Sequence, residues 1–493
     1  MRARLLRIVK RAALLVAAIL LALLAVRIWD TQRGPPLEVW HTHAPVELTA
    51  EELDEADWSR YLAAEQAVFD DVRAEVTAQL EPEDRIPINR YFEGSPVYPG
   101  RFAQDWNRSY VLEPDGAPVG AVVLLHGLTD APYSQRHIAR SYAAHGFVAI
   151  VPRLPAHGTV PAALSEVEWE DWLAATRLAV REARARIGAS LPLHLVGFSN
   201  GGALAMKYAL DAIENPALTP PDRLVLISPN IGITAFARFA GLAGLPAFLP
   251  HFAKAAWLSI LPEFNPFKYN SFPVNGARQT WQMTQVLQEQ ILRLARSDRL
   301  VDLPPILTFQ SVIDFTVSTR AIITSLYAHL PANGSELVLF DMNRSAKLGP
   351  LLSTAADIVL TRILLPPPRR FRTVVISNAG DSDEVMERVI EAGAETEQVR
   401  PLGLTWPLGV FSLSHVAVPF PPSDGLYGFA PDPSEDFGIA LGTIAARGEV
   451  GALIVSLDTL LRMSSNPFFP YMIGRIEGGI GPAPRTAEVP ARP

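Results

Sequence analysis

The sequence contains no cysteine among its 493 residues. This absence excludes disulfide bonds, thiolate metal sites, a cysteine nucleophile and lipid attachment through an N-terminal cysteine. The sequence also lacks an excess of positive charge, because 43 Lys and Arg residues stand against 51 Asp and Glu residues, for a net charge of −8. A nucleic-acid-binding protein needs a basic face to neutralise phosphates, so we expect no nucleic-acid partner.

Two common chemical motifs are missing as well. No His-Glu-x-x-His pattern occurs, so we expect no zinc-protease site, and no glycine-rich phosphate loop follows an apolar strand, so we expect no nucleotide. His41 and His43 have i,i+2 spacing in a segment that resembles a linker, and this pattern alone does not indicate a metal site. The sequence therefore predicts neither a metal nor a cofactor.

The composition is that of a folded protein. Hydrophobic residues make up 49% of the chain and charged residues 19%, which supplies ample material for a buried core. A largely disordered or fibrous protein is thereby excluded. The length corresponds to about three domains of roughly 150 residues, or to one large α/β domain with insertions.

The N-terminus carries a membrane-targeting pattern. An unbroken apolar run spans residues 12–26, and five basic residues precede it: Arg2, Arg4, Arg7, Lys10 and Arg11. Because basic flanks stay on the cytoplasmic side, we predict a membrane anchor or signal-anchor over residues 1–29, with the rest of the chain on the extracytoplasmic (periplasmic) side. The run is short for a span, so a cleaved signal peptide and a buried amphipathic helix are alternatives. Ala22 and Ala25 do not form an Ala-x-Ala pair, which favours retention of the segment.

Residues 30–103 are predicted to form a linker followed by a helical N-terminal extension. Thr49 and Glu52 have the spacing of a capping box, and helical periodicity continues to Leu80. We expect this acidic segment either to pack on the main domain or to separate it from the bilayer.

From about residue 104, short apolar runs alternate with helical stretches. Strands are predicted at residues 108–112, 119–125, 147–151, 193–196, 224–227, 306–312 and 336–340, and helices at about 134–145, 168–187, 200–213 and 317–329. The first two strands flank a turn at residues 113–116, so we expect them to pair with each other. Alternating strands and helices predict an α/β fold with a mostly parallel sheet flanked by helices.

Two insertions interrupt this alternation. We assign residues 104–234 and 304–341 to the two halves of the core, and residues 235–303 to an apolar insertion between them. A second insertion covers residues 342–410 and contains one strand-like run, 371–376. Residues 411–480 return to the core, and the Pro- and Ala-rich residues 481–493 are expected to be disordered.

The motif Gly197-Phe198-Ser199-Asn200-Gly201 is the pattern in the sequence that indicates a nucleophile. It is a G-x-S-x-G pattern directly after an apolar strand and directly before a helix, which is the context of a nucleophile elbow. Small flanking residues let the backbone bend sharply, and the serine oxygen lies beside a helix N-terminus that favours negative charge. The alternative is an ordinary tight strand-to-helix turn.

Three stretches resemble a known superfamily. They are the segments 126–134 (HGLTDAPYS), 152–159 (PRLPAHGT) and 197–202 (GFSNGG). The chain resembles the α/β-hydrolase superfamily, and within it the monoacylglycerol lipase, carboxylesterase and serine aminopeptidase-like branch. The resemblance covers about residues 104–340 and 411–428. The middle stretch departs from the branch, because Ala156 replaces the first glycine of Gly-His-Gly.

The resemblance implies roles for three residues near the two strand ends. Ser199 would be the nucleophile. The backbone N–H groups of Leu128, in the loop after the strand that ends at Leu125, and of Asn200, directly after the nucleophile, would form the oxyanion hole. Two fixed donors of this kind stabilise a developing oxyanion without reorganisation.

The resemblance also implies the order serine, acid, histidine for the remaining catalytic residues. Three histidines follow the serine: His251 lies in the apolar insertion, His329 in a helical stretch, and His415 in a loop-like stretch after the last strands. We predict His415 as the base. Asp314, at the end of an apolar strand, is predicted as the acid that orients it, and Asp341, after the next strand, is the alternative.

In this superfamily, an insertion between these strands usually forms a cap over the active site. The insertion at residues 235–303 is rich in aromatic residues: Phe236, Phe239, Phe248, Phe252, Trp257, Phe264 and Phe267. Their apolar surface would suit an acyl chain. Alternatively, these side chains pack the insertion onto the core, or they contact the bilayer beside the anchor.

Together these features predict a membrane-tethered serine hydrolase that cleaves carboxylic esters through an acyl-enzyme. The expected partners are a small-molecule or lipid-like ester and, through the N-terminal helix, a membrane. A peptidase or amidase of the serine aminopeptidase type is the alternative within enzymes. A non-catalytic binding protein with the hydrolase fold is the alternative from another class.

Overall fold

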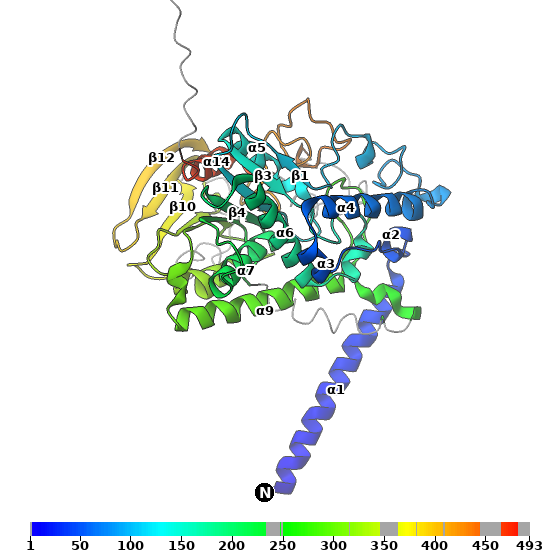
Figure 1. Ribbon diagram of the computed structural model, residues 1–493. Coiled ribbons are helices and arrows are strands. Elements are labelled where there is room, and N and C mark those ends of the chain that lie inside the picture. The colour runs from blue at the N-terminus through cyan, green and yellow to red at the C-terminus, as the bar shows by residue number, and fades with distance from the viewer. Residues whose placement is uncertain are drawn as a thin grey trace, which may run out of the picture.

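The centre of the molecule is a single large β-sheet (Figure 1). A computed structural model describes residues 2–232, 247, 250–314, 316–345, 363–380, 382–407, 410–443 and 465–481. Within these residues the sheet has ten strands in the order β1-β3-β2-β4-β5-β8-β9-β10-β11-β12. Their bounds are β1 Tyr110–Leu112, β2 Gly120–Leu125, β3 Phe147–Val151, β4 Leu193–Phe198, β5 Arg223–Ile227, β8 Ile306–Ser311, β9 Glu336–Phe340, β10 Arg372–Asn378, β11 Glu384–Ile390 and β12 Gln398–Thr405.

The strands from β3 to β10 are parallel to one another, which confirms the predicted mostly parallel sheet. Every residue of β2, β3, β4 and β8 is buried. Parallel strands covered on both faces have this near-continuous apolar character. The outer strands β11 and β12 are antiparallel, and burial in β11 alternates along the strand, as expected where one face meets solvent.

The predicted pairing of the first two strands is wrong. β1 pairs with β3 in antiparallel register, with Tyr110 opposite Val151, and does not pair with β2. The two edges of β2 are occupied by the parallel strands β3 and β4. β1, which is only partly buried, therefore lies at the edge of the sheet.

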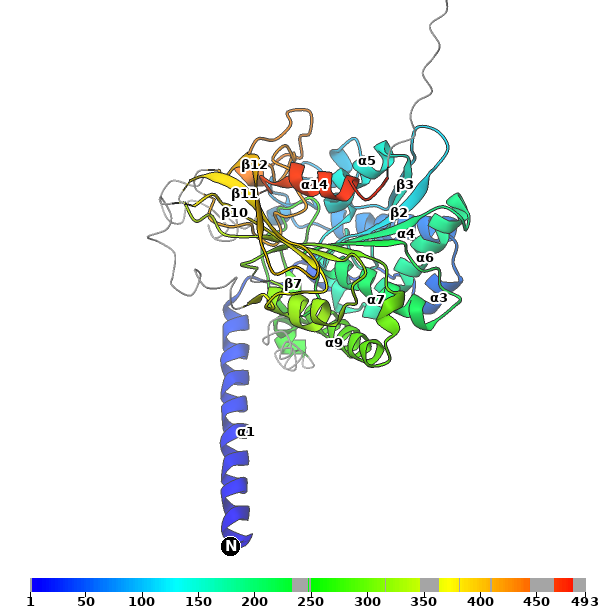
Figure 2. The ribbon, with the colours of Figure 1, turned by 90° about the vertical axis from the view of Figure 1, so that its left-hand side faces the viewer.

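Helices cover both faces of the sheet (Figure 2). The helices α6 (Trp169–Ile187), α7 (Asn200–Glu214) and α9 (Val274–Arg296) pack on one face, together with Val123 of β2. On the other face, α5 (Arg136–Ala144) and α14 (Phe469–Glu477) pack with Leu124. Consecutive residues of β2 thus enter opposite cores, because side chains alternate across a strand. The helices predicted near residues 134–145, 168–187 and 200–213 correspond to α5, α6 and α7.

Shorter helical segments complete the described part of the chain. The helix predicted at residues 317–329 consists of α10 (Thr319–Ala321), the π-helix η10 (Ile322–Leu326) and the 3-10 helix η11 (Tyr327–His329). The other 3-10 helices are η2 (Pro82–Asp84), η3 (Pro99–Arg101), η4 (Pro132–Gln135), η5 (Pro161–Ser165), η8 (Pro250–Ala256), η9 (Arg299–Asp302) and η13 (Leu441–Thr443).

The N-terminal extension packs on the domain. It contains α2 (Val39–Thr42), α3 (Ala50–Glu55), α4 (Trp58–Val72) and the π-helix η1 (Arg73–Thr77). The predicted capping box at the start of α3 is confirmed, with Thr49 and Glu52 bonded in both directions. Arg153, after β3, is almost fully buried and pairs with Glu47 at 2.7 Å and with Glu65 at 3.1 Å. This buried cluster joins the extension to the sheet.

The first helix, α1 (Arg2–Arg33), extends away from the domain (Figures 1 and 2). Its exposed side chains include Leu14, Leu15 and Trp29, each more than half exposed. In the described part of the chain, no helix has the length and apolar character required to cross a membrane. The membrane helix predicted over residues 1–29 is therefore without support from the structure.

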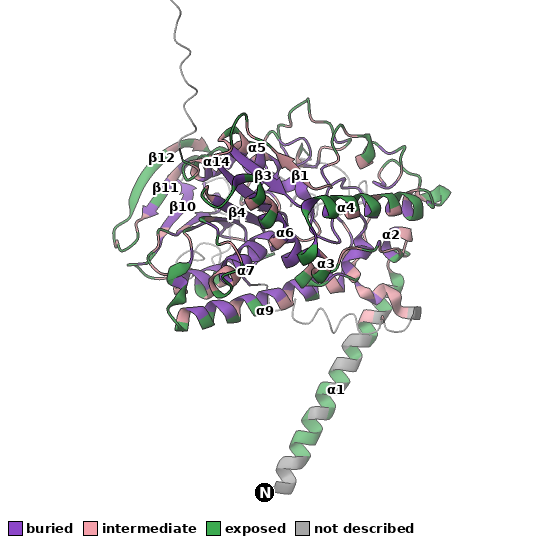
Figure 3. Ribbon diagram, viewed as in Figure 1, coloured by how far each residue is buried: buried purple, intermediate pink, exposed green. Residues whose placement is uncertain are grey.

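The second insertion contributes to the main sheet. Residues 342–410 supply β10, β11 and β12, of which the sequence predicted only the run at residues 371–376. β12 forms the sheet edge, and most of its residues are exposed (Figure 3). β11 and β12 were missed because charged residues in β11, and polar, charged and glycine residues in β12, interrupt the apolar ones and leave no continuous apolar run.

The described part of the first insertion contains η8, the short strands β6 (Trp257–Ser259) and β7 (Phe272–Pro273), and α9. Phe264 and Phe267 are buried, and the Phe267 ring stacks on Tyr133 with centroids 4.2 Å apart. For these two aromatics the packing alternative is therefore correct. Phe236, Phe239 and Phe248 lie outside the described residues, as do residues 482–493 of the predicted disordered tail.

Candidate active site

Ser199 occupies a strained turn between β4 and α7. Its φ of 55° and ψ of −115° are unusual for a residue other than glycine. The backbone around it is bonded on both sides: the Ser199 N–H donates to Ile227 O at 2.9 Å, and Ser199 O accepts from the N–H of Asn230 at 3.0 Å. Such strain costs about 1–3 kcal/mol and persists only where the surrounding structure enforces it. Because Ser199 directly follows β4, it lies at the carboxyl end of a central strand, as the motif predicted.

The glycines on either side of Ser199 are required by close backbone contacts. A Cβ atom on Gly197 would lie 2.3 Å from the carbonyl oxygen of Gly201. A Cβ atom on Gly201 would lie 2.2 Å from the carbonyl oxygen of Leu125, at the end of β2. The G-x-S-x-G pattern is therefore a steric requirement of this turn, which matches the nucleophile-elbow interpretation.

Asp314 and His415 are in direct contact although 101 residues separate them. Nδ1 of His415 lies 2.8 Å from Oδ2 of Asp314, and the Asp314 side chain is fully buried. The other carboxylate oxygen accepts from the backbone N–H groups of Thr316 at 2.8 Å and Val317 at 3.0 Å. These bonds position Asp314 just after β8, with one oxygen directed at the histidine.

Asp314 is ionised in this environment. Burial raises the pKa of its carboxyl group, but the neighbouring His415 and the bonds from Val317 and Thr316 outweigh burial and hold the pKa below its usual range. An ionised carboxylate only accepts hydrogen bonds, so Nδ1 of His415 is the donor in this contact. The His415 ring lies 5.3 Å from the ring of Phe198, the residue before Ser199. The imidazole is therefore next to the elbow.

The alternative residues have other environments. Asp341 is 2% exposed and pairs with Arg344 at 2.7 Å. Its backbone N–H donates to Ile376 O. His329 lies in η11, and the side chain of His251, in η8, is outside the described residues. Of the two acid candidates, Asp314 is the one in contact with His415.

The two predicted oxyanion residues lie near Ser199. Asn200 is the first residue of α7, where N–H groups have no partner within the helix. A Cβ atom on Gly127, which precedes Leu128, would lie 3.2 Å from Cβ of Ser199, so the loop after β2 is adjacent to the elbow. Their role as backbone donors stays a prediction.

The sequence did not identify Lys268 and Tyr269, which bind the loop after β2. The Tyr269 N–H donates to Thr129 O at 2.8 Å, and Lys268 Nζ donates to Thr129 Oγ1 at 2.9 Å. Thr129 has a left-handed backbone, with a φ of 62°, and directly follows Leu128. The first insertion thus stabilises a strained loop that is 139 residues away from Lys268. No sequence pattern connects the two segments.

A second cluster joins the C-terminal part of the chain to α5. Asp424 is fully buried and accepts from Arg136 at 2.6 Å and from Tyr133 at 2.9 Å. Arg136 also pairs with Glu435 at 2.6 Å. This cluster connects the segment that follows His415 to the loop and helix that follow β2. Within the described ranges, no group of three or more His, Cys, Asp or Glu side chains is placed to bind a metal ion.

Comparisons with known proteins find a family and relatives that are similar to part of this chain. Residues 122–315 match the model of the alpha/beta hydrolase family. A thermostable monoacylglycerol lipase from Bacillus sp. (strain H-257) is 30% identical over 138 residues, which cover 27% of this chain and 50% of that protein. The chain thus spans about half the length of the curated relative it matches.

Solved structures of lipolytic enzymes are also similar. A structure from work on the metagenome-derived lipolytic enzymes LipS and LipT has a TM-score of 0.39 and 22% identity, and covers 48% of this chain and 88% of that chain. A soluble variant of monoglyceride lipase from Saccharomyces cerevisiae has a TM-score of 0.36 and 14% identity, and covers 47% of this chain and 80% of that chain. With its mostly parallel sheet and its match over residues 122–315, this part of the chain has the fold of an α/β-hydrolase, and its sequence is similar to that of a monoacylglycerol lipase over 138 residues.

Proposed function

We propose that this protein is a serine hydrolase that cleaves carboxylic esters with Ser199, His415 and Asp314. One observation carries the proposal: the 2.8 Å contact between His415 and Asp314 lies beside a strained turn that presents Ser199. A nucleophile, a base and a group that orients the base are the three parts of this chemistry.

The proposed reaction has two halves. Nε2 of His415 accepts the proton of Ser199 Oγ while Oγ attacks the ester carbonyl carbon. The N–H groups of Leu128 and Asn200 donate to the oxyanion of the tetrahedral intermediate. The intermediate collapses as His415 gives the proton to the departing alkoxide, which leaves an acyl-enzyme and a free alcohol. Water, deprotonated by His415, then releases the acid and restores Ser199. Asp314 stays ionised and stabilises the imidazolium in both halves.

For the substrate we propose an uncharged ester with an acyl chain. The curated relative is named a monoacylglycerol lipase, and the match to it supports a lipid-like ester.

We also propose that the N-terminal segment holds the hydrolase domain at a membrane, on the extracytoplasmic side. Support comes from the charge pattern around residues 12–26 and from the exposed apolar side chains of α1, among them Leu14, Leu15 and Trp29. An exposed apolar helix that extends from its domain is stabilised by apolar surroundings.

The proposed function is tested with purified protein and a panel of short- and long-chain esters beside aminoacyl amides. We expect ester hydrolysis by the wild-type protein, and a loss of at least about a thousandfold in Ser199→Ala. Ser190→Ala is the matched control, because Ser190 is exposed at the opposite end of the same strand, before β4 begins.

Three results would contradict the proposal. Substantial turnover by a folded Ser199→Ala protein would remove Ser199 from the mechanism. Faster cleavage of aminoacyl amides than of esters would favour the peptidase alternative. Absence of turnover and of covalent labelling in the wild-type protein would favour a non-catalytic binding protein.

A further inference from the structure

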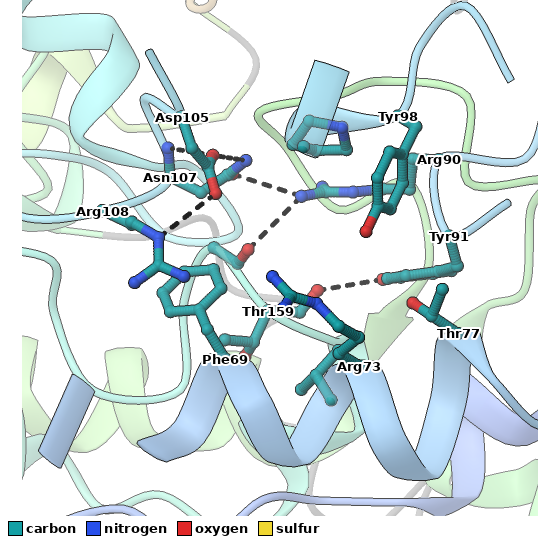
Figure 4. A pocket seen from close by; sticks show the side chains of 14 residues that line it. Phe69, Arg73, Thr77, Arg90, Tyr91, Tyr98, Asp105, Asn107, Arg108 and Thr159 are labelled. Atoms are coloured by element: carbon teal, nitrogen blue, oxygen red, sulfur yellow. Dashed lines mark hydrogen bonds and ion pairs between the residues drawn. The ribbon is translucent and has the colours of Figure 1, made fainter. Parts of the chain in front are cut away.

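A pocket lies between the N-terminal extension and the domain (Figure 4). The residues that line it are distant in sequence from the three candidate catalytic residues. It has a volume of about 70 Å³, which is room for several water molecules. Its walls come from α4 and η1, from the segment of residues 90–108, and from Gly158 and Thr159 after β3. Ser199, Asp314 and His415 do not line it.

Positive charge predominates in this pocket. The guanidinium groups of Arg73, Arg90 and Arg108 lie around the same space in Figure 4, whereas Asp105 is the one carboxylate among the described residues that line it. Asp105 lies 3.6 Å from Nε of Arg108, whose guanidinium also rests 4.0 Å from the centre of the Phe69 ring. Neither Arg73 nor Arg90 therefore forms an ion pair with a carboxylate that lines the pocket.

Arg90 is a buried cation bonded to uncharged acceptors. It is 2% exposed, and its terminal nitrogens donate to Asn265 O, Asn107 Oδ1 and Gly158 O at 3.2–3.3 Å. Its Nε–H has no partner, and no carboxylate among the described residues lies within ion-pair distance. A buried charge without a counter-charge is costly.

Glu263 is an acid close enough to interact electrostatically with Arg90, but its carboxylate is bonded to other groups. The carboxylate of Glu263 accepts from the backbone N–H groups of Asn270 and Ser271 at 3.0 and 2.7 Å. Burial raises the pKa of Glu263, and the neighbouring Arg90 only partly opposes that rise. Glu263 therefore offsets the charge of Arg90 only from a distance.

Arg73 lies at the mouth of the pocket. Its side chain is 61% exposed, and the nearest carboxylate is that of Asp70 at 3.9 Å, a distance typical of a weak surface pair. Tyr98 and Thr77 also line the pocket, and the Tyr98 side chain extends toward the same space (Figure 4). An exposed arginine opposite a buried one provides donors on two sides of a small ligand.

We propose that this pocket binds a small oxyanion, either a phosphate group or a carboxylate. The ligand lies between Arg73 and Arg90, and both guanidinium groups supply the charge-assisted hydrogen bonds that such oxyanions favour. The hydroxyl group of Tyr98 is a further donor. The ligand provides the negative charge that the described surroundings of Arg90 lack.

Isothermal calorimetry on the full chain tests the proposal, with inorganic phosphate in one arm and acetate in the other. We expect saturable binding of at least one anion, weakened about tenfold or more in Arg73→Gln, because one charge-assisted hydrogen bond is lost. Arg60→Gln is the control, since Arg60 is an exposed arginine on the same helical segment, one that does not line the pocket. Tighter binding of phosphate identifies a phosphate ligand, and tighter binding of acetate identifies a carboxylate.

Two results would overturn the proposal. One is the absence of saturable binding for both anions, and the other is equal affinity in the wild-type protein and Arg73→Gln. Arg73→Gln should hydrolyse esters at the wild-type rate without added anion, which confirms that the variant is folded. Failure of the pocket proposal would thus leave the proposed ester hydrolysis untouched.

Discussion

Asp314 and Asp341 show how the surroundings of one residue type decide its role. Both follow a strand of the central sheet, β8 for Asp314 and β9 for Asp341. Asp314 contacts His415, whereas Asp341 forms an ion pair with Arg344, three residues further along the chain. Both residues also fit the order serine, acid, histidine, so the choice of Asp314 depended on the resemblance of its strand to the family pattern, and in the structure Asp314 is the one that contacts His415.

Exchange of each carboxylate for an amide separates these two roles. Asp314→Asn should lower kcat by about 10⁴, because the imidazole loses the acceptor that sets its tautomer. Asp341→Asn should keep kcat near the wild-type value and lower the free energy of unfolding by about 1–3 kcal/mol, because Arg344 loses its counter-charge. Steady-state kinetics and urea denaturation measure the two effects. The reverse pattern would make Asp341 the catalytic acid.

At the same scale, local motifs could be predicted and contacts between distant segments could not. Ser199 was found because strand, serine and glycines are consecutive in the sequence. The bond between Lys268 and Thr129 joins segments 139 residues apart, and no periodicity or spacing indicates it. Arg90 likewise lies in a stretch without a motif.

At the scale of elements, the turn between β4 and α7 depends on glycine. Gly197→Ala should destabilise the protein by about 2–4 kcal/mol, because the new Cβ would meet the backbone of Gly201 and the turn must shift. Gly474→Ala is the matched control: Gly474 is in α14 with nothing within 4 Å of an added Cβ, so that variant should be neutral or gain about 0.5–1 kcal/mol. Urea denaturation compares them. Equal stability of both variants would contradict the steric account of the elbow.

Buried parallel strands were the elements best predicted from sequence. β3 and β9 have the predicted bounds, because β3 is a continuous apolar run, β9 is apolar after Glu336, and turn residues flank both. The partner of β1 was predicted wrongly, since pairing depends on which sheet edges are free. β11 and β12 were missed because strands with one solvated face have a weaker apolar signal.

At the scale of the whole molecule, five histidines with lowered pKa values make stability depend on pH. They are His41, His126, His137, His157 and His194. Burial lowers the pKa of each, to about 4 for His41 and His157 and to about 3 for His194. Between pH 6.5 and 4 the unfolded chain therefore binds protons that the folded chain does not, and the free energy of unfolding falls as the pH falls.

We expect the melting temperature to drop steeply between pH 7 and pH 5. Each of these histidines contributes about 1.4 kcal/mol per pH unit below its unfolded pKa. Burial also raises the pKa of six carboxyl groups, among them Asp130 and Glu263, and these groups act in the opposite direction at lower pH. Differential scanning fluorimetry across this range measures the effect. A melting temperature that stays constant or rises toward pH 5 would contradict it.

Our prediction of where the protein is located in the cell is based on its N-terminal charge pattern. In a bacterial host we expect the protein to fractionate with membranes and to resist high-salt or alkaline extraction, and protease added to spheroplasts should digest the domain. Recovery of a soluble form that begins near Ile28 would indicate a cleaved signal peptide. Protection of the domain in spheroplasts would place the hydrolase in the cytoplasm. Neither result affects the assignment of Ser199.

The proposal that Ser199 is an activated nucleophile is tested most directly by covalent labelling. A fluorophosphonate probe reacts with serine nucleophiles that a neighbouring base activates. We expect the wild-type protein to gain the mass of one adduct, located by peptide mass spectrometry on Ser199, and Ser199→Ala to gain none. A folded wild-type protein that stays unlabelled, or one labelled at another residue, would contradict the central claim.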